Sequence, residues 1–149
     1  MALRALIKGG YFDVIPDFEQ RHINELEKTD KAAAKAYLQN EAFVVSCRVI
    51  SAHESATLGD LAGVIMDNYN SVSRPTISQA FLYACRVCIV NWRNLKDDEN
   101  RNIEFKGIKL DGKCIGATDE DLDRLPEDVK RNVYEEIRRR MKVAKRDVF

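Results

Sequence analysis

The sequence predicts a small, mainly α-helical domain of about four to five helices, with a short N-terminal β-hairpin and a β-hairpin insert before the last helix. Three observations support this fold class. Helix-capping residues precede several apolar segments, as at Thr118. The pairs Gly9-Gly10 and Asp111-Gly112 each separate two short apolar segments, as two-residue hairpin turns do. The last helix carries an apolar stripe at a spacing of four residues, formed by Leu125, Val129, Val133, Ile137 and Met141.

A chain of 149 residues is long enough for one domain with a hydrophobic core, and 45% apolar with 32% charged residues is ordinary globular composition. We therefore expect a single domain over residues 1–149. Its predicted parts are an N-terminal hairpin (1–16), a helical core (31–93), an acidic loop with the hairpin insert (94–117) and the C-terminal helix (118–149).

Overall charge and hydropathy exclude several classes of protein. Lys and Arg together number 24, as do Asp and Glu, so no overall field attracts the chain to nucleic acid or to a membrane surface. The longest apolar runs are far shorter than the roughly 18 residues that a membrane-spanning helix needs. The N-terminal residues lack the apolar core of a secretory signal. These features predict a cytosolic protein.

The N-terminal hairpin is expected from residues 2–7 and 11–15, which flank the glycine pair. Pro16 should end its second strand, because proline has no N–H to donate to a neighbouring strand. Residues 17–30 are polar and charged, and they fit either a short helix or a linker.

Three helices are predicted in the helical core. Asp30 can cap the first, over residues 31–52, where three consecutive alanines favour helix although the valines near its end also favour strand. Thr57 with Asp60 can cap the second. The third, residues 77–92, is apolar on nearly every side and should be central. Its expected core side chains are Phe81, Ala84, Cys88 and Trp92.

After the third helix, a polar turn cluster should form an exposed loop. Residues 103–110 alternate loosely and, with Asp111-Gly112, predict the second hairpin, because both turn positions need positive φ. Thr118 with Asp121 can then cap a short helical turn before the last helix.

Acidic and basic residues are concentrated in different segments of the C-terminal part of the chain. Residues 97–123 hold nine acids and four bases, whereas residues 124–149 hold nine bases and five acids. Such runs are often only solvated surface, and nucleic-acid binding is disfavoured because no interleaved aromatics or second basic patch accompany the arginines. Opposite charges on one chain also favour head-to-tail association between copies. The candidate partner-binding residues are Asp97, Asp98, Glu99, Arg138, Arg139 and Arg140.

Cys85 and Cys88 have C-x-x-C spacing but lie within an apolar helical segment, so they are expected to be buried thiols rather than a redox pair. A zinc site that adds Cys47 and Cys114 has the right number of ligands, but the second pair is not close in sequence. No phosphate-binding loop, nucleophile elbow or zinc-protease motif occurs in the sequence. We expect no catalytic residue, cofactor or bound metal, and a protein that is not an enzyme.

Residues 92–141 show an ordered series of features: a Trp that ends an apolar segment, an acidic turn, a short apolar strand, an acid-rich cap with Leu-Pro, and an amphipathic helix. This series resembles the C-terminal half of tail assembly chaperones of tailed bacteriophages. Two features depart from the family's pattern: Asn100-Arg101-Asn102 replaces the turn glycine, and residues 106–116 are an extra hairpin. The positions that carry the resemblance are Trp92, Asp97, Asp98, Glu99, Ile103, Phe105, Leu125, Pro126, Val129 and Ile137.

The resemblance implies a non-enzymatic protein that acts in the host-cell cytoplasm during infection and need not remain in the mature virion. Its implied partners are the tape measure protein, which it coats, and the tail tube protein, whose subunits it helps to assemble; homo-oligomers are also compatible. Two other classes stay open. One is a virion structural protein, such as a head–tail connector or a minor tail component, and the other is an uncharacterised zinc-binding or enzymatic domain.

Overall fold

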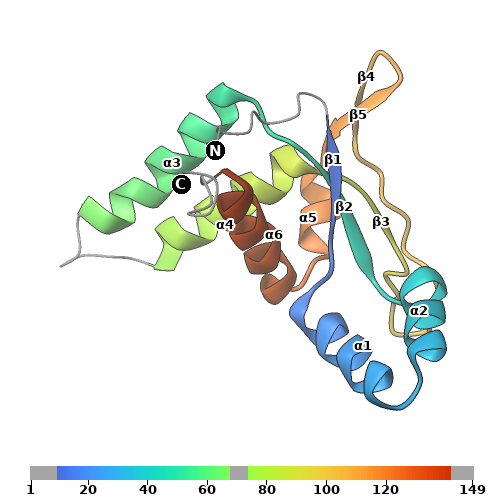
Figure 1. The fold of residues 1–149 in the computed structure, drawn as a ribbon. Helices are drawn as coiled ribbons and strands as arrows, with labels where there is room; N and C mark the ends of the chain where they lie inside the picture. Colours follow the sequence, from blue (N-terminus) through green and yellow to red (C-terminus); the bar gives the residue numbers. More distant parts are fainter. Residues whose placement is uncertain (1–9, 68–73, 142–149) are drawn as a thin grey trace.

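The computed structural model describes residues 10–67 and 74–141, and the fold is given for these residues (Figure 1). They form six helices and five short strands, which confirms the predicted mainly helical fold class. The elements in chain order are β1 (Tyr11–Val14), α1 (Asp17–Thr29), α2 (Lys31–Asn40), β2 (Val44–Arg48), α3 (Ala52–Asp67), α4 (Arg74–Cys88), β3 (Ile89–Arg93), β4 (Ile108–Leu110), β5 (Lys113–Gly116), α5 (Asp119–Asp123) and α6 (Glu127–Met141).

A three-stranded antiparallel sheet in the order β1-β2-β3 lies beside the helices. Phe12 pairs with Cys47, and Val45 pairs with both Val14 and Trp92. All five of these side chains are buried. Because directly paired residues share a face, this face of the sheet is the one that covers the core.

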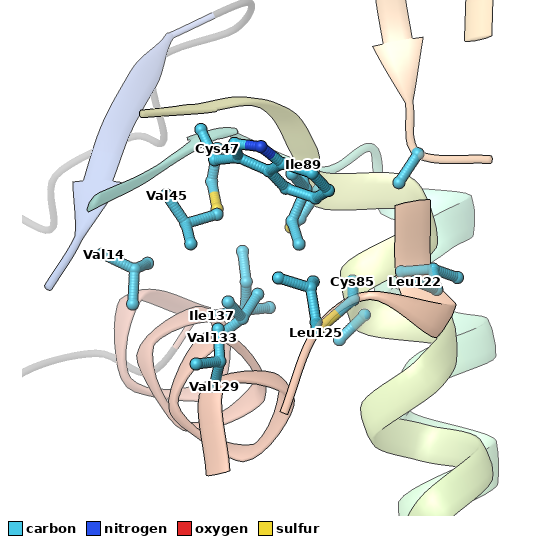
Figure 2. Close-up of a cluster of buried hydrophobic side chains, with 14 of the residues drawn as sticks. Val14, Val45, Cys47, Cys85, Ile89, Leu122, Leu125, Val129, Val133 and Ile137 are labelled. Atoms are coloured by element: carbon cyan, nitrogen blue, oxygen red, sulfur yellow. The ribbon is translucent and has the colours of Figure 1, made fainter. Parts of the chain in front are cut away.

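The core fills the space between this sheet and α4, α5 and α6. Figure 2 shows Val129, Val133 and Ile137 pointing from α6 toward Val14 and Val45 on the strands. Each of the three α6 residues is at most 2% exposed. The predicted apolar stripe is thus confirmed from Leu125 to Ile137, while the side chain of Met141 lies outside the described residues.

The predicted helix over residues 31–52 is wrong after Asn40. Asp30 does cap α2, since its carboxylate accepts from the N–H groups of Ala32 and Ala33, but the chain then turns and enters β2. Val44 and Val45 are adjacent and at most 1% exposed, so both faces of the strand are covered at this point. A continuous apolar run is typical of such a buried strand, and here the strand propensity of valine prevails over the helical pattern.

The third predicted helix also ends early, at Cys88, and the chain continues directly as strand β3. Trp92 therefore lies on a strand rather than on a helix. The helix that remains is apolar on one side only: Ala84 and Cys85 are fully buried, whereas Arg86 is exposed. The segment looks apolar on every side because a helix with one buried side is followed directly by a strand that buries Ile89 and Trp92.

Helix α3 begins at Ala52 rather than at Thr57. Ser51 and Glu54 cap it reciprocally: the Ser51 hydroxyl accepts from the Glu54 N–H, and the Glu54 carboxylate accepts from the Ser51 N–H. Thr57 instead donates its hydroxyl proton to the carbonyl of His53 within the helix. The same Glu54 carboxylate pairs with both terminal nitrogens of Arg48, which ties the start of α3 to β2.

The predicted strand at residues 2–7 lies outside the described residues, and β1 pairs with β2. Residues 17–29 are helical, which decides between the two alternatives for that segment. The second hairpin is confirmed, although its first strand begins only at Ile108; φ is 51° at Asp111 and 78° at Gly112, as the turn requires. Among the described residues, no helix is long and apolar enough to span a membrane.

Trp92→Ala should lower the free energy of unfolding by about 3–5 kcal/mol, because it leaves a cavity in the core. Trp92 is 5% exposed, its indole N–H donates to the Ile103 carbonyl at 2.7 Å, and its ring lies 5.0 Å from that of Phe105. A urea melt measures the change. Asn91→Ala, at an exposed position of the same strand, is the control. A loss below about 1 kcal/mol would place Trp92 among ordinary surface positions.

Candidate partner-binding surfaces

The predicted acidic residues form a turn that is closed mainly on itself. The Asp97 carboxylate accepts from the backbone N–H groups of Glu99 and Arg101, each at 2.9 Å. The Arg101 side chain forms ion pairs with Asp97 at 3.1 Å and with Glu99 at 3.0 Å. The hydrogen bond from the Arg101 backbone is the largest influence that lowers the pKa of Asp97. Asp98 is exposed on the same turn.

Asn100 has a φ of 62° in this turn, so it takes the left-handed conformation. Asn enters this conformation more readily than most residues, which explains how the turn forms without a glycine. Arg101 provides the counter-charge within the turn.

The predicted basic residues at the end of α6 differ from one another. Arg139 and Arg140 both pair with Glu136 one turn earlier, and the hydrogen bond from Arg139 is the largest influence that lowers the pKa of Glu136. The Arg140 guanidinium also lies 4.2 Å from the centre of the Phe12 ring, a cation–π contact with β1. Arg138 is half-buried. Arg140 is thus part of the packing, whereas Arg139 is largely exposed, with 70% side-chain exposure.

The structure does not bring the acidic and basic residues together. The loop that contains the acidic turn starts beside α2, where Arg93 donates to the Leu38 carbonyl and Asn94 to the Ala42 carbonyl. The last turn of α6 lies instead against β1, on the other side of the sheet from that loop (Figure 1). The two sets are therefore separate surfaces, and contact between them in different copies stays a prediction.

A groove adjoins each surface. One of about 480 Å³ lies between the acidic turn and α5, with Asp97, Arg101, Phe105 and Arg124 among its lining residues. The other, of about 320 Å³, lies between β1, α1 and α6, and is lined by residues that include Asp13, Val14, Asp17, Glu135 and Arg139. Both combine apolar and charged side chains, so they fit an amphipathic protein segment in chemical character.

Asp121 organises the segment between the acidic turn and the last helix. Its carboxylate is 1% exposed and accepts the backbone N–H groups of Lys106 at 2.9 Å, Gly107 at 2.8 Å and Thr118 at 3.0 Å. It also accepts the Thr118 hydroxyl at 2.9 Å. The predicted capping box of α5 is confirmed, and the same carboxylate additionally joins the two ends of the β4–β5 hairpin.

Burial alone would raise the pKa of Asp121, but the hydrogen bonds from Lys106, Thr118 and Gly107 outweigh it and lower the pKa below its ordinary value. The carboxylate is therefore held in its charged, acceptor-only form, which is the form that four converging donors require. This charge joins the segment before β4 to the segment after β5.

The β4–β5 hairpin carries apolar side chains that were not predicted as functional. Ile108 is 41%, Leu110 59% and Ile115 39% exposed, so three of the five exposed large apolar residues of the described part lie here. Figure 1 shows the hairpin projecting from the body of the molecule. The apolar alternation at Ile108 and Leu110 was a visible signal, but it predicted only a strand, because nothing in a sequence shows whether a short hairpin is covered.

Cys47, Cys85 and Cys88 are buried in the core. Burial is the main cause that raises their pKa values, to about 12 for Cys85, so they remain thiols at neutral pH. Cys114 is half-buried in the hairpin, apart from this core cluster. Within residues 10–67 and 74–141, no group of three or more His, Cys, Asp or Glu side chains has an arrangement suited to a metal ion.

Comparisons of the chain with protein-family models, with curated proteins and with solved structures find no match.

Asp121→Asn should lower the free energy of unfolding by about 2–3 kcal/mol at neutral pH, because the amide nitrogen cannot accept from the converging N–H groups. Chemical denaturation with urea measures this. Asp123→Asn, at an exposed position of the same short helix, should change stability little. Equal stability of the two variants would contradict the central role of Asp121.

The same variant should lose part of the pH dependence of stability. Because the folded-state pKa of Asp121 is lowered from its ordinary value, its contribution is present above the unfolded-state pKa and is lost as the pH falls through the folded-state pKa. The stability difference between the wild-type protein and Asp121→Asn should therefore shrink below about pH 4. Urea melts at a series of pH values measure it, and a difference that grows on acidification would have the wrong sign.

Proposed function

We propose that this protein is a non-enzymatic tail assembly chaperone of a tailed bacteriophage, which binds the tape measure protein and assists assembly of the tail tube around it. It acts in the host-cell cytoplasm during assembly. The proposal rests on the resemblance of residues 92–141 to that family, together with the way in which these residues are arranged in the fold.

One observation supports the proposal most. The residues of the resemblance are far apart in sequence but belong to one structural unit, in which the indole N–H of Trp92 donates to the carbonyl of Ile103 and the Trp92 ring meets Phe105 edge to face. Leu125, Val129 and Ile137 join Trp92 in the same core cluster. The apolar positions of the series therefore pack into one structural unit, as the proposal requires.

The surfaces are suitable for holding a long amphipathic chain. Tyr11 on β1 and Phe18 on α1 are 63% and 45% exposed, and both belong to elements that form the groove between β1, α1 and α6. Arg139 and carboxylates line that groove. Apolar contact provides affinity without strict sequence demands, and charged rims keep the free protein dispersed. A chaperone for a long hydrophobic protein needs both properties.

Co-expression with the tape measure protein from the same genome tests the proposal, with the soluble fraction of the tape measure protein as the readout. The wild-type chain should keep it soluble. Arg138→Glu with Arg139→Glu should reduce the soluble fraction at low salt, and less so at high salt, because exposed charges are screened over about 8 Å at physiological ionic strength. Arg140 stays unchanged because it packs on Phe12.

The matched control is Lys31→Glu with Lys35→Glu, which reverses two exposed charges on α2 and should leave the soluble fraction unchanged. Failure of the wild-type chain to keep the tape measure protein soluble would contradict the proposed function. Equal behaviour of the two double variants would show that the charges of Arg138 and Arg139 do not contribute to binding of the tape measure protein. Mass spectrometry of purified virions separates a chaperone, which is absent from them, from a structural component.

A further inference from the structure

The β4–β5 hairpin exposes apolar side chains that are not packed in the core. It projects from the body of the molecule (Figure 1). Its apolar residues contribute little to the core, since Ile108, Leu110 and Ile115 are between 39% and 59% exposed. A projecting apolar surface of this kind commonly marks a protein-binding site.

The two faces of the hairpin have different chemistry. Side chains alternate along β4, so Ile108 and Leu110 share one face and Lys109 points to the opposite face. Leu110 pairs directly with Lys113, so the Lys113 ammonium group lies on the face of Leu110, whereas Lys109 pairs with Cys114. A strand added beside β4 would therefore meet Ile108 and Leu110 on one face and the Lys109 ammonium group on the other.

The hairpin is held rigidly at its base. The Asp121 carboxylate fixes the N–H groups of Lys106 and Gly107 where the hairpin begins. Gly116, where it ends, lies so close to the carbonyl of Arg86 that a Cβ atom would collide with it. A binding surface held in place before the partner arrives loses little conformational entropy on binding.

The outer edge of β4 is free in the described part of the chain, where this sheet has only the strands β4 and β5. The residues that flank a two-residue turn exchange their hydrogen bonds, so the N–H and C=O of Leu110 point toward Lys113. The N–H and C=O of Lys109 then point outward from the edge. An exposed edge of this kind is a template for an added strand.

Charge identifies the kind of strand that fits. A second copy that paired symmetrically with β4 about its middle residue would place Lys109 opposite Lys109, and directly opposed like charges are destabilising. An acidic residue opposite Lys109 is favourable instead. Its two neighbours would point to the other face, beside Ile108 and Leu110, where apolar side chains are favourable.

We propose that the β4 edge binds an extended segment of a partner protein by strand addition, and that this segment reads apolar, acidic, apolar opposite Ile108, Lys109 and Leu110. The identity of the partner as the tape measure protein rests on the proposed function. The hairpin is thus a second contact site, separate from the end of α6.

Overlapping peptides that cover the tape measure protein of the same genome test this inference, with binding to the full chain measured by fluorescence anisotropy. The peptides that bind should share the apolar-acidic-apolar pattern. Leu110→Ser and Lys109→Glu should each weaken their binding by about tenfold or more. Ala32→Ser and Lys35→Glu are the controls, at two exposed positions of α2 outside both proposed contact surfaces, and should leave binding unchanged.

Two further measurements test whether the peptide binds by strand addition with its acidic residue opposite Lys109. A copy of the strongest peptide with its acidic residue changed to Lys should bind the Lys109→Glu variant better than it binds the wild-type chain. Hydrogen exchange of the Lys109 amide should slow when the original peptide binds, because strand addition gives that N–H an acceptor. Thermal melts of each variant confirm that it is folded.

The outcomes separate the two proposals. A wild-type chain that keeps the whole tape measure protein soluble, with no loss in Lys109→Glu or Leu110→Ser, would overturn the hairpin inference and leave the proposed function standing. Binding peptides without the pattern, an unprotected Lys109 amide or the absence of any binding peptide would overturn it as well. A wild-type chain that does not keep the tape measure protein soluble overturns the proposed function itself.

Discussion

The buried carboxylate of Asp121 is the interaction on which the C-terminal part of this fold depends. It accepts N–H groups from Lys106 and Gly107 before the hairpin and from Thr118 after it. One side chain thereby closes the base of the hairpin and starts α5. The short helix in turn leads into α6, whose apolar stripe closes the core against the sheet. The Asp121 carboxylate thus both caps a helix locally and fixes a segment about fifteen residues earlier in the chain.

A second buried carboxylate has an equivalent role in the N-terminal part. Glu19 on α1 is 6% exposed and accepts the hydroxyl of Tyr37 at 2.6 Å and the backbone N–H of Phe43 at 2.5 Å. It joins both helices of the α1–α2 pair to the entry of β2. Burial and the nearby Glu19 raise the pKa of Tyr37 to about 12, so its hydroxyl remains a donor at neutral pH. Both carboxylates hold the chain together at points where an element begins.

Several other charged side chains form ion pairs with residues only two to four positions away in the sequence. Asp97 and Glu99 meet Arg101 in one turn, and Glu136 meets Arg139 and Arg140 in one helix. Local pairs on the surface contribute little to stability, and they reduce the field that a distant partner would experience. Under the proposed function, recognition would then depend on apolar surface with single charges beside it, which is the character of the β4–β5 hairpin and of the groove next to α6.

The sequence by itself determined the elements whose signals are local. Asp111-Gly112 defined a turn because few residues other than glycine, asparagine and aspartate take positive φ readily, and Thr118 with Asp121 defined a cap. The stripe of α6 followed from helical spacing alone. The candidate charges were also identified from sequence, but their pairing with Arg101 and Glu136 and the cation–π contact of Arg140 required the folded chain.

Only the tertiary structure decided the short apolar segments. Val44 and Val45 follow the alanine-rich sequence of α2, and Ile89 and Trp92 follow the apolar sequence of α4. In each case the sequence suggests that the helix continues, but the segment is a strand. A run of four or five apolar residues is compatible with a buried helix or a buried strand, and the choice depends on which neighbours cover it. The exposure of Leu110 was undetermined for the same reason: burial is a property of the packed chain, which pairs residues far apart in sequence.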